Sequence, residues 1–437
     1  MEKSWTLNKF NTYLSIPTIS AQKKGINDTV KFLLALFKET GLKAKVIDTG
    51  GNPVVFAEHI TGDKAKTILF YNHYDVQPPE PLDKWISPPF NPVVRKGKLF
   101  ARGTADNKGN LIARISAVKE LLNENPRLPV NIKFMVEGEE EIGSPSLPKF
   151  TAKYRNLIKA DLCIWESGSR DEKGNPEITL GCKGICHMEL LVRGAKTDLH
   201  SSKGVILSNP AWRLIWALAS LKDENENILI KGFYKNVREP RAVEKEVVRK
   251  IQFYESAKKK EFGIPGFVNN LTGEKLKLRY FYAPALNING LTSGYQGLGH
   301  KTVLPKQASV KIDFRLVPNQ TPKEVITLLR DHLKRTGFAD IEIQNSRGYP
   351  PAQTQPDNPY VLLIEKVQNQ VYHKKVVIEP LSAASGPMYL FSPLMPCVSV
   401  GVSYPGANIH APNENIRLND FWLNIKCIRG IIKSLFK

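Results

Sequence analysis

Short apolar runs that alternate with helical patterns are the feature that most restricts how this chain can fold. Apolar runs cover residues 67–71, 130–136 and 161–165, and an amphipathic helix is expected from Asp28 to Thr40. Between the first two runs, apolar residues recur at spacings of three and four, which predicts a second helix. Strands that alternate with helices favour a mostly parallel sheet with helices on both faces, so the expected fold class is α/β.

Residues of the types that bind metal ions follow these runs. Because ligands of open parallel sheets gather at the carboxyl ends of the strands, the residues after each run are expected to lie close together. His73 and Asp75 follow the first run, the acidic stretch Glu137–Glu141 the second and Glu166 the third. Two further candidates are His410, after an apolar run at 397–402, and Asp106, in the stretch 102–109. Adjacent carboxylates repel one another, and a bound divalent cation compensates for this repulsion. The sequence therefore predicts a metal site assembled from several strand ends.

Two divalent ions about 3.5–4 Å apart that share a carboxylate can activate a water and polarise a carbonyl. A single histidine or acidic residue of this kind is more often a surface or capping residue. The prediction therefore depends on the occurrence of all these candidate ligands in one chain. His73 and Asp75 are two residues apart and point the same way in an extended segment. The Asp75 carboxylate is therefore expected to accept a hydrogen bond from the His73 imidazole and to fix its tautomer.

The middle of the chain has a different pattern. Residues 308–316 alternate between apolar and polar, as a half-exposed strand does, and residues 187–193 do so more loosely. A helical pattern follows each of them, which indicates a small α+β layer. We interpret 185–350 as an inserted domain, and 1–184 with 351–437 as the two parts of the first domain.

Composition excludes several classes of protein. The net charge of +20 is carried by dispersed lysines without a nucleic-acid-binding motif, so it is interpreted as surface charge, and no nucleic acid partner is expected. No apolar stretch is long enough to span a membrane and the first residues do not resemble a signal peptide, so a cytoplasmic protein without a membrane partner is expected. Five scattered cysteines do not form a disulfide framework.

Several longer stretches together resemble the M20 metallopeptidase family, which contains carnosinase-like dipeptidases, glutamate carboxypeptidase and amino-acid deacylases. The resemblance runs from about Lys9 to Phe421 and favours the dipeptidase branch. The stretches that carry it are Tyr71–Pro78, Trp85–Phe90, Gly97–Gly103, Asp106–Gly109, Glu139–Ser144, Asp198–Ser201, Lys301–Pro305, Arg315–Asn319 and His410–Glu414. It implies a catalytic domain of the di-zinc exopeptidase type and a ferredoxin-like lid as the inserted domain.

The resemblance also implies roles for individual residues. His73 and Glu166 would hold one metal ion, Glu141 and His410 the other, and Asp106 would bridge the two. Zinc is the expected metal, with manganese or cobalt as alternatives. Glu140 would be the general base, and Asp75 would orient His73. His200 would stabilise the reacting carbonyl. The remaining residues would contact the substrate: Arg315, Thr302, Ser385 and Gly386. Because Glu139, Glu140 and Glu141 are adjacent, an alternative stays open in which Glu139 is the general base and Glu140 the metal ligand.

The expected activity is hydrolysis of dipeptides or short peptides that end in a free carboxylate. An N-acyl-amino-acid deacylase with the same metal site is the alternative, and a metal-binding scaffold without catalysis is a more remote one. The resemblance further implies a cis peptide between Asp106 and Asn107. It also implies a homodimer formed through the lid, in which His200 completes the active site of the partner.

Overall fold

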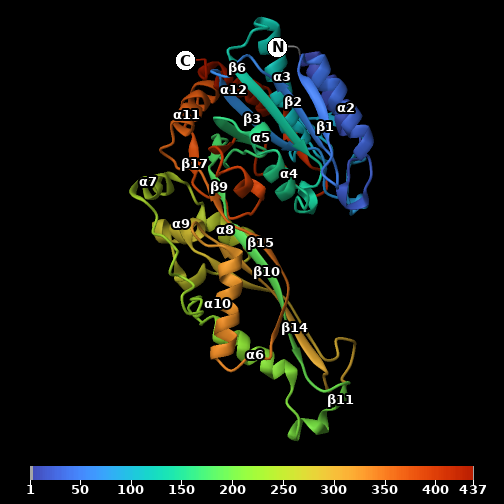
Figure 1. The fold of residues 1–437 in the computed structure, drawn as a ribbon, viewed down its shortest axis with the longest axis vertical. Coiled ribbons are helices and arrows are strands. Elements are labelled where there is room, and N and C mark those ends of the chain that lie inside the picture. The colour runs from blue at the N-terminus through green and yellow to red at the C-terminus, as the bar shows by residue number, and fades with distance from the viewer. Residues whose placement is uncertain (1–2, 437) are drawn as a thin grey trace. The chain divides into compact units, whose positions relative to one another are not determined.

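The computed structural model describes residues 3–436, which form two compact units (Figure 1). The first unit contains residues 1–181, 353–380 and 390–437, and the second contains 182–352 and 381–389. The borders thus lie within three residues of the 184/185 and 350/351 positions expected from the sequence, and the short segment 381–389 groups with the second unit. No helix within residues 3–436 is long and apolar enough to cross a membrane.

An eight-stranded mixed sheet forms the centre of the first unit. Its strands, in spatial order, are β1 (Lys43–Ile47), β2 (Val54–His59), β6 (Val130–Glu137), β3 (Lys66–His73), β7 (Leu162–Trp165), β18 (Cys397–Ser399), β8 (Glu177–Thr179) and β17 (Val377–Glu379). The four central strands, β6, β3, β7 and β18, are mutually parallel, whereas β1, β2 and β8 each have an antiparallel neighbour. Their carboxyl ends therefore meet at one edge of the sheet.

Helices cover both faces of this sheet, as predicted. The helices of the first unit are α1 (Lys3–Leu14), α2 (Ile26–Glu39), α3 (Lys108–Glu124), α4 (Leu147–Lys153), α5 (Arg155–Ile158), α11 (Pro359–Tyr372) and α12 (Leu418–Ser434). Phe134 of β6 packs against Phe37 of α2, with ring centroids 5.2 Å apart. The preceding residue, Lys133, donates hydrogen bonds to the Leu157 and Lys159 carbonyls beside α5. Because successive side chains of a strand point to opposite faces, α2 and α5 lie on opposite sides of the sheet.

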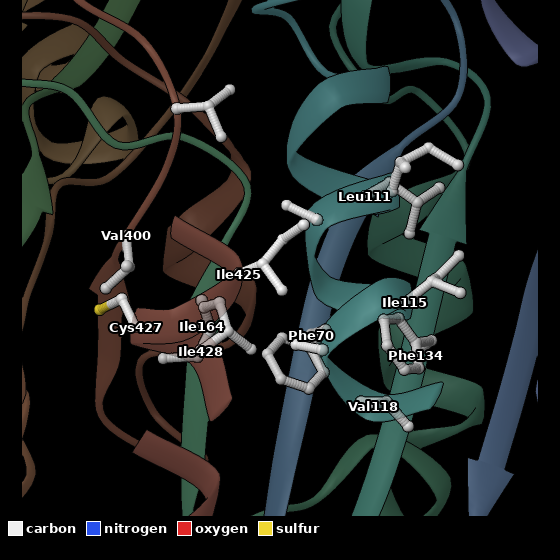
Figure 2. Packing of buried hydrophobic residues seen from close by; sticks show 14 of the residues in the cluster. Phe70, Leu111, Ile115, Val118, Phe134, Ile164, Val400, Ile425, Cys427 and Ile428 are labelled. Carbon is white, nitrogen blue, oxygen red and sulfur yellow. The ribbon is translucent and has the colours of Figure 1, made fainter. Parts of the chain in front are cut away.

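The main core lies between the sheet and the helices α3 and α12. Figure 2 shows Ile115 and Val118 of α3 beside Phe134 of the sheet, and Ile428 of α12 near Ile164 of β7. All of these side chains are completely buried. The apolar residues that predicted the second helix from their spacing therefore face this core. Among residues 3–436 there is no disulfide, and the five cysteines are buried, in agreement with the sequence analysis.

The second unit contains a four-stranded antiparallel sheet in the order β12 (Ala285–Ser293), β14 (Gln307–Leu316), β10 (Gly184–Arg193) and β15 (Glu342–Tyr349). Helices α6 (Pro210–Leu221) and α10 (Pro322–Arg335) pack on one face, where Leu190 belongs to the core. The chain order strand–helix–strand–strand–helix–strand is that of a ferredoxin-like fold, as expected. The lysine-rich segment between α6 and β12 forms further helices: α7 (Ala242–Lys250), α8 (Glu255–Phe262) and α9 (Gly273–Tyr282).

Candidate active site

The carboxyl ends of the parallel strands bring the predicted ligands of the first unit together. His73 is the last residue of β3, and Glu166 directly follows β7. Glu140 and Glu141 lie in a short 3-10 helix, Glu140–Ile142, that follows β6, and His410 lies in the loop between β18 and β19 (Asn415–Arg417). The edge of the sheet thus positions residues that are more than 300 positions apart in the sequence.

The Asp106 carboxylate lies between two imidazoles. Its Oδ1 is 3.0 Å from His73 Nε2, and its Oδ2 is 3.1 Å from His410 Nε2. Glu141 Oε2 is 3.2 Å from His410 Nε2, and Glu166 Oε2 is 3.9 Å from His73 Nε2. Ligand atoms of His73, Asp106 and Glu141 all lie within 4.8 Å of one another, so these three residues could hold one metal ion.

The arrangement of polar atoms fits a divalent metal. When His73 Nδ1 carries the hydrogen and donates it to the Asp75 carbonyl at 3.0 Å, the Nε2 lone pair faces an oxygen of Asp106. Two acceptors face each other stably only if a cation or a proton lies between them. Glu141 Oε1 and Glu166 Oε2 are also buried without a hydrogen-bond partner. Imidazole nitrogens and carboxylate oxygens are the donor set that zinc takes in catalytic sites.

The charges of the site indicate the same need for cations. Burial raises the pKa of Glu140 to about 8 with the help of the nearby carboxylates of Asp106 and Glu141, although the charge of His73 opposes them. Hydrogen bonds from His410 and His73 overcome the effect of burial and lower the pKa of Asp106. A bound cation would relieve the repulsion among these carboxylates and favour their charged forms.

Asp75 is close to His73, but not quite as expected. Its main-chain carbonyl oxygen is 3.0 Å from His73 Nδ1, whereas its carboxylate oxygen Oδ1 is 3.4 Å away. The carboxylate instead accepts hydrogen bonds from the backbone N–H groups of Glu140 (3.3 Å) and Glu141 (3.1 Å). Asp75 therefore connects the His73 strand end to the acidic 3-10 helix, and its carbonyl is the nearer acceptor for the imidazole.

The loop that carries Asp106 is held by a buried carboxylate that the sequence analysis did not single out. Glu414 Oε2 accepts hydrogen bonds from Arg102 Nη1 (2.8 Å) and the Gly103 N–H (2.9 Å), and Oε1 accepts from the Ala105 (2.9 Å) and Asp106 (3.1 Å) N–H groups. Both Arg102 and Glu414 are almost completely buried. The cis peptide predicted between Asp106 and Asn107 is present.

A second buried cation supports the strand ends. Arg114 of α3 donates from Nη1 to the Tyr71 carbonyl and to Asn72 Oδ1, both at 2.8 Å. Its Nη2 reaches the Glu166 and Val400 carbonyls, both at 3.2 Å. One side chain thus connects the ends of β3, β7 and β18, which carry or precede three of the candidate ligands.

These supporting residues left only a weak signal in the sequence. Arg102 and Glu414 lie within the stretches that carry the family resemblance, beside the candidate ligands. Their pairing over 312 positions has no local pattern. Arg114 is a charged residue at a buried position of an otherwise apolar helix face, which is the one hint that it serves the site.

The predicted residues of the inserted domain lie in the second unit. His200 of β11 (Leu199–His200) is 3.4 Å from Thr302 Oγ1, measured from Nε2, and its Nδ1 is 2.9 Å from Ser202 Oγ. Arg315 of β14 donates from Nη1 to Ser385 Oγ at 3.0 Å. Next to Ser385, the Gly386 carbonyl faces the Cys182 thiol at 3.8 Å. The candidate substrate residues thus form two separate groups, one at His200 and one at Arg315.

Comparisons with known proteins agree with the family resemblance of the sequence. The model for "Peptidase family M20/M25/M40" matches residues 69–434. The Beta-Ala-His dipeptidase of Rattus norvegicus is 31% identical over 307 residues, which cover 68% of this chain and 62% of the rat protein. The Cys-Gly metallodipeptidase dug1 of Schizosaccharomyces pombe is 30% identical over 368 residues, which cover 80% of this chain and 76% of the yeast protein.

A solved structure shows the same architecture over the whole chain. The M20 family metallo-carboxypeptidase Sso-CP2 from Sulfolobus solfataricus superposes with a TM-score of 0.91 at 37% sequence identity, and covers 99% of both chains. The fold and the family inferred from the sequence are therefore confirmed. The chain is a metallopeptidase and belongs to peptidase family M20/M25/M40.

Proposed function

We propose that this enzyme hydrolyses the peptide bond of dipeptides or short peptides that end in a free carboxylate, with two divalent metal ions. The observation that carries the proposal is the Asp106 carboxylate, whose two oxygens each face a different imidazole at 3.0 and 3.1 Å. A carboxylate in this position suits a bridge between two ions. His73 and Glu166 would complete one site, and Glu141 and His410 the other. Zinc suits these ligands best, with manganese or cobalt as alternatives.

When bound, such ions would lower the pKa of a water molecule and polarise the substrate carbonyl. Glu140 is the residue that we assign to proton transfer. It accepts a proton from the attacking water and later donates it to the nitrogen of the leaving amine. Glu140 lies next to the ligand Glu141, and its burial raises the pKa of its carboxyl group, which favours the uptake of a proton.

Arg315 would bind the C-terminal carboxylate of the peptide. A guanidinium group binds a carboxylate through two parallel hydrogen bonds, which fixes the orientation of the peptide as well as its position. Ser385 Oγ accepts a hydrogen bond from Arg315 Nη1 and restricts the arginine. Gly386 and Thr302 are the further substrate contacts in this proposal, and His200 would donate a hydrogen bond to the reacting carbonyl oxygen.

His200 and Arg315 cannot serve one substrate within a single copy of the second unit. Arg315 lies near the end of β14, whereas His200 lies beyond its start, in a strand paired with β13 (Val303–Leu304). The stretch from Gln307 to Arg315 alone extends about 27 Å in an antiparallel strand. We therefore propose a homodimer in which His200 of each copy completes the site of the other.

The second unit exposes an apolar surface suited to such a dimer. Trp212 and Trp216 of α6 are 55% and 57% exposed, with their rings stacked at 5.9 Å. In the same unit, strand β12 is an edge of the sheet and exposes Ile288 and Leu291. An exposed strand edge next to apolar side chains is a surface that pairs readily across a two-fold axis.

Product analysis tests the proposed activity. The zinc-loaded enzyme is incubated with a mixture of dipeptides, tripeptides and N-acyl amino acids, and the products are identified by mass spectrometry. Cleavage of the peptides supports the proposal, provided that a chelator and the substitution Glu140→Gln both abolish it. Cleavage of the N-acyl amino acids alone would instead identify a deacylase.

Subunit complementation tests the dimer. His200→Ala and Glu140→Gln are each expected to be inactive, but after subunit exchange a mixed dimer contains one site with both groups intact. Return of activity on mixing supports the crossed site. A native enzyme that sediments as a monomer, or exchanged subunits that stay inactive, would refute it.

A further inference from the structure

A basic pocket lies beside Arg315, within the second unit. Its volume is about 440 Å³, and four cationic side chains line it, those of Lys183, Lys222, Arg279 and Arg315. Many of its lining residues, among them Lys222, Leu276 and Arg279, come from the lysine-rich segment between α6 and β12. Among the described residues, Glu226 is the one acid that lines the pocket, and it forms an ion pair with Lys222.

Lys183 is the most firmly placed of these cations. Its side chain is almost entirely buried, with a residue exposure of 5%. Its Nζ donates hydrogen bonds to the carbonyls of Tyr280 (2.9 Å) and Ala283 (2.7 Å) at the end of α9. An ammonium group has three donors, so one remains for another acceptor. Burial, together with the positive charges of Arg315 and Arg279, lowers the pKa of Lys183 to about 8.

The protein neutralises the two arginines only in part, because the one ion pair that links them to a described carboxylate is the long contact between Arg315 and Asp313. Among residues 3–436, the guanidinium of Arg279 makes no hydrogen bond or ion pair. Arg315 donates to the neutral Ser385 hydroxyl, and the nearest carboxylate oxygen, from Asp313, is 3.7 Å from its Nε. Three cations that surround a cavity repel one another unless an anion enters it. The pocket is therefore built for an anionic group.

We propose that this pocket binds the side-chain carboxylate of the substrate's C-terminal residue, so that the enzyme prefers peptides ending in glutamate or aspartate. The inference rests on the proposed function, in which Arg315 binds the main-chain carboxylate of that residue. The two carboxylates of such a residue are only a few bonds apart, and Arg315 lines the same pocket as Lys183 and Arg279. Leu276 and Leu286, which also line it, can contact the methylene groups of the side chain.

A matched peptide series tests this preference. Ala-Glu and Ala-Gln have nearly the same shape and differ in charge, so their kcat/KM ratio isolates the carboxylate. Because hydrogen bonds to charged groups are the stronger ones, Ala-Glu is expected to be cleaved about 10-fold or more efficiently than Ala-Gln. Arg279→Gln should bring the ratio towards one, and Arg279→Glu should favour Ala-Lys. Lys275→Gln is the control, because Lys275 lies exposed on the same helix outside the pocket and should leave the ratio unchanged.

Binding of the free products provides a readout without turnover. Calorimetry with glutamate and glutamine should show tighter binding of glutamate, and Arg279→Gln should remove the difference. Equal cleavage of Ala-Glu and Ala-Gln, with equal binding of the two amino acids, would overturn the pocket assignment and leave the peptidase function standing. Tight glutamate binding without cleavage of any peptide would support the pocket while refuting the proposed function.

Discussion

The substitution Glu414→Gln removes one buried negative charge with little change of shape. In the native protein the two oxygens of Glu414 accept four hydrogen bonds, two each. A glutamine keeps one oxygen and presents an amide nitrogen, itself a donor, in place of the other. If the oxygen stays with Arg102 and Gly103, the N–H groups of Ala105 and Asp106 lose their acceptor.

The expected cost follows from these contacts. Each buried donor left without an acceptor costs about 1–3 kcal/mol, so two donors cost about 2–6 kcal/mol. Removing the anionic partner of the buried Arg102 is expected to cost a similar amount of stability, about 3–5 kcal/mol. The two estimates describe overlapping effects, so we expect the free energy of unfolding to fall by about 3–5 kcal/mol. Because the same N–H groups hold the Asp106 loop, zinc affinity should also fall, by about 10–100-fold, as it does when supporting residues of metal sites are changed.

Two measurements separate loop positioning from general destabilisation. Urea unfolding of the metal-free protein gives the change in stability, and competition with a zinc chelator gives the change in affinity. Glu120→Gln is the matched control, since Glu120 pairs with Arg429 of α12 and does not contact the Asp106 loop. It should reduce stability and leave zinc affinity unchanged. If Glu414→Gln alters neither the unfolding midpoint nor zinc affinity, the role assigned to Glu414 is wrong.

Three further predictions concern the metal site and the second unit. Glu140→Gln should lower kcat by about 10²–10⁴-fold or more with unchanged zinc content; loss of zinc would instead mean that the register of the acidic stretch is shifted. His410→Ala should reduce the zinc content from two ions to one, and a fully active two-ion variant would refute its assignment as a ligand. Burial raises the pKa of Glu244, but hydrogen bonds from Arg238 and from backbone outweigh this and lower it below its usual 4.5. The stabilisation by Glu244 is therefore present above that pH and lost as pH falls through the lowered pKa, so Glu244→Gln should make urea unfolding less dependent on pH in this acidic range.

Local patterns in the sequence were sufficient to predict where the strands lie and which candidate ligands follow them. The run 67–71 became β3, with His73 at its end, and the run 130–136 became β6. A buried strand has a strong compositional signal, and the end of a parallel strand is a predictable place for ligands. The helix expected from Asp28 to Thr40 also lies close to α2 (Ile26–Glu39), because the apolar residues there recur with helical spacing.

Contacts between distant segments were not predictable in this way. Nothing local indicates that Glu414 accepts hydrogen bonds from the Asp106 loop, since the partners meet only after the whole first unit has folded. The Asp75 carbonyl proved a nearer acceptor for His73 than the carboxylate, a difference of a few tenths of an ångström that backbone geometry decides. Helix α8, in the segment between α6 and β12, lacks a clear apolar period, and neither the helices of this segment nor the pocket wall was predicted from the sequence.

The discontinuous first unit has a consequence for synthesis on the ribosome. Strand β18, which pairs with β7, and helix α12, which covers α3, are made only after the entire second unit. At translation rates of about 5–20 residues per second, His410 emerges roughly 12–50 seconds after Glu166. During this delay the side of α3 that α12 later covers and one edge of β7 stay uncovered, so the nascent chain is a candidate for chaperone binding. Completion of the proposed two-ion site would then follow translation, because its last ligand, His410, and the carboxylate that holds the Asp106 loop are made together after the second unit.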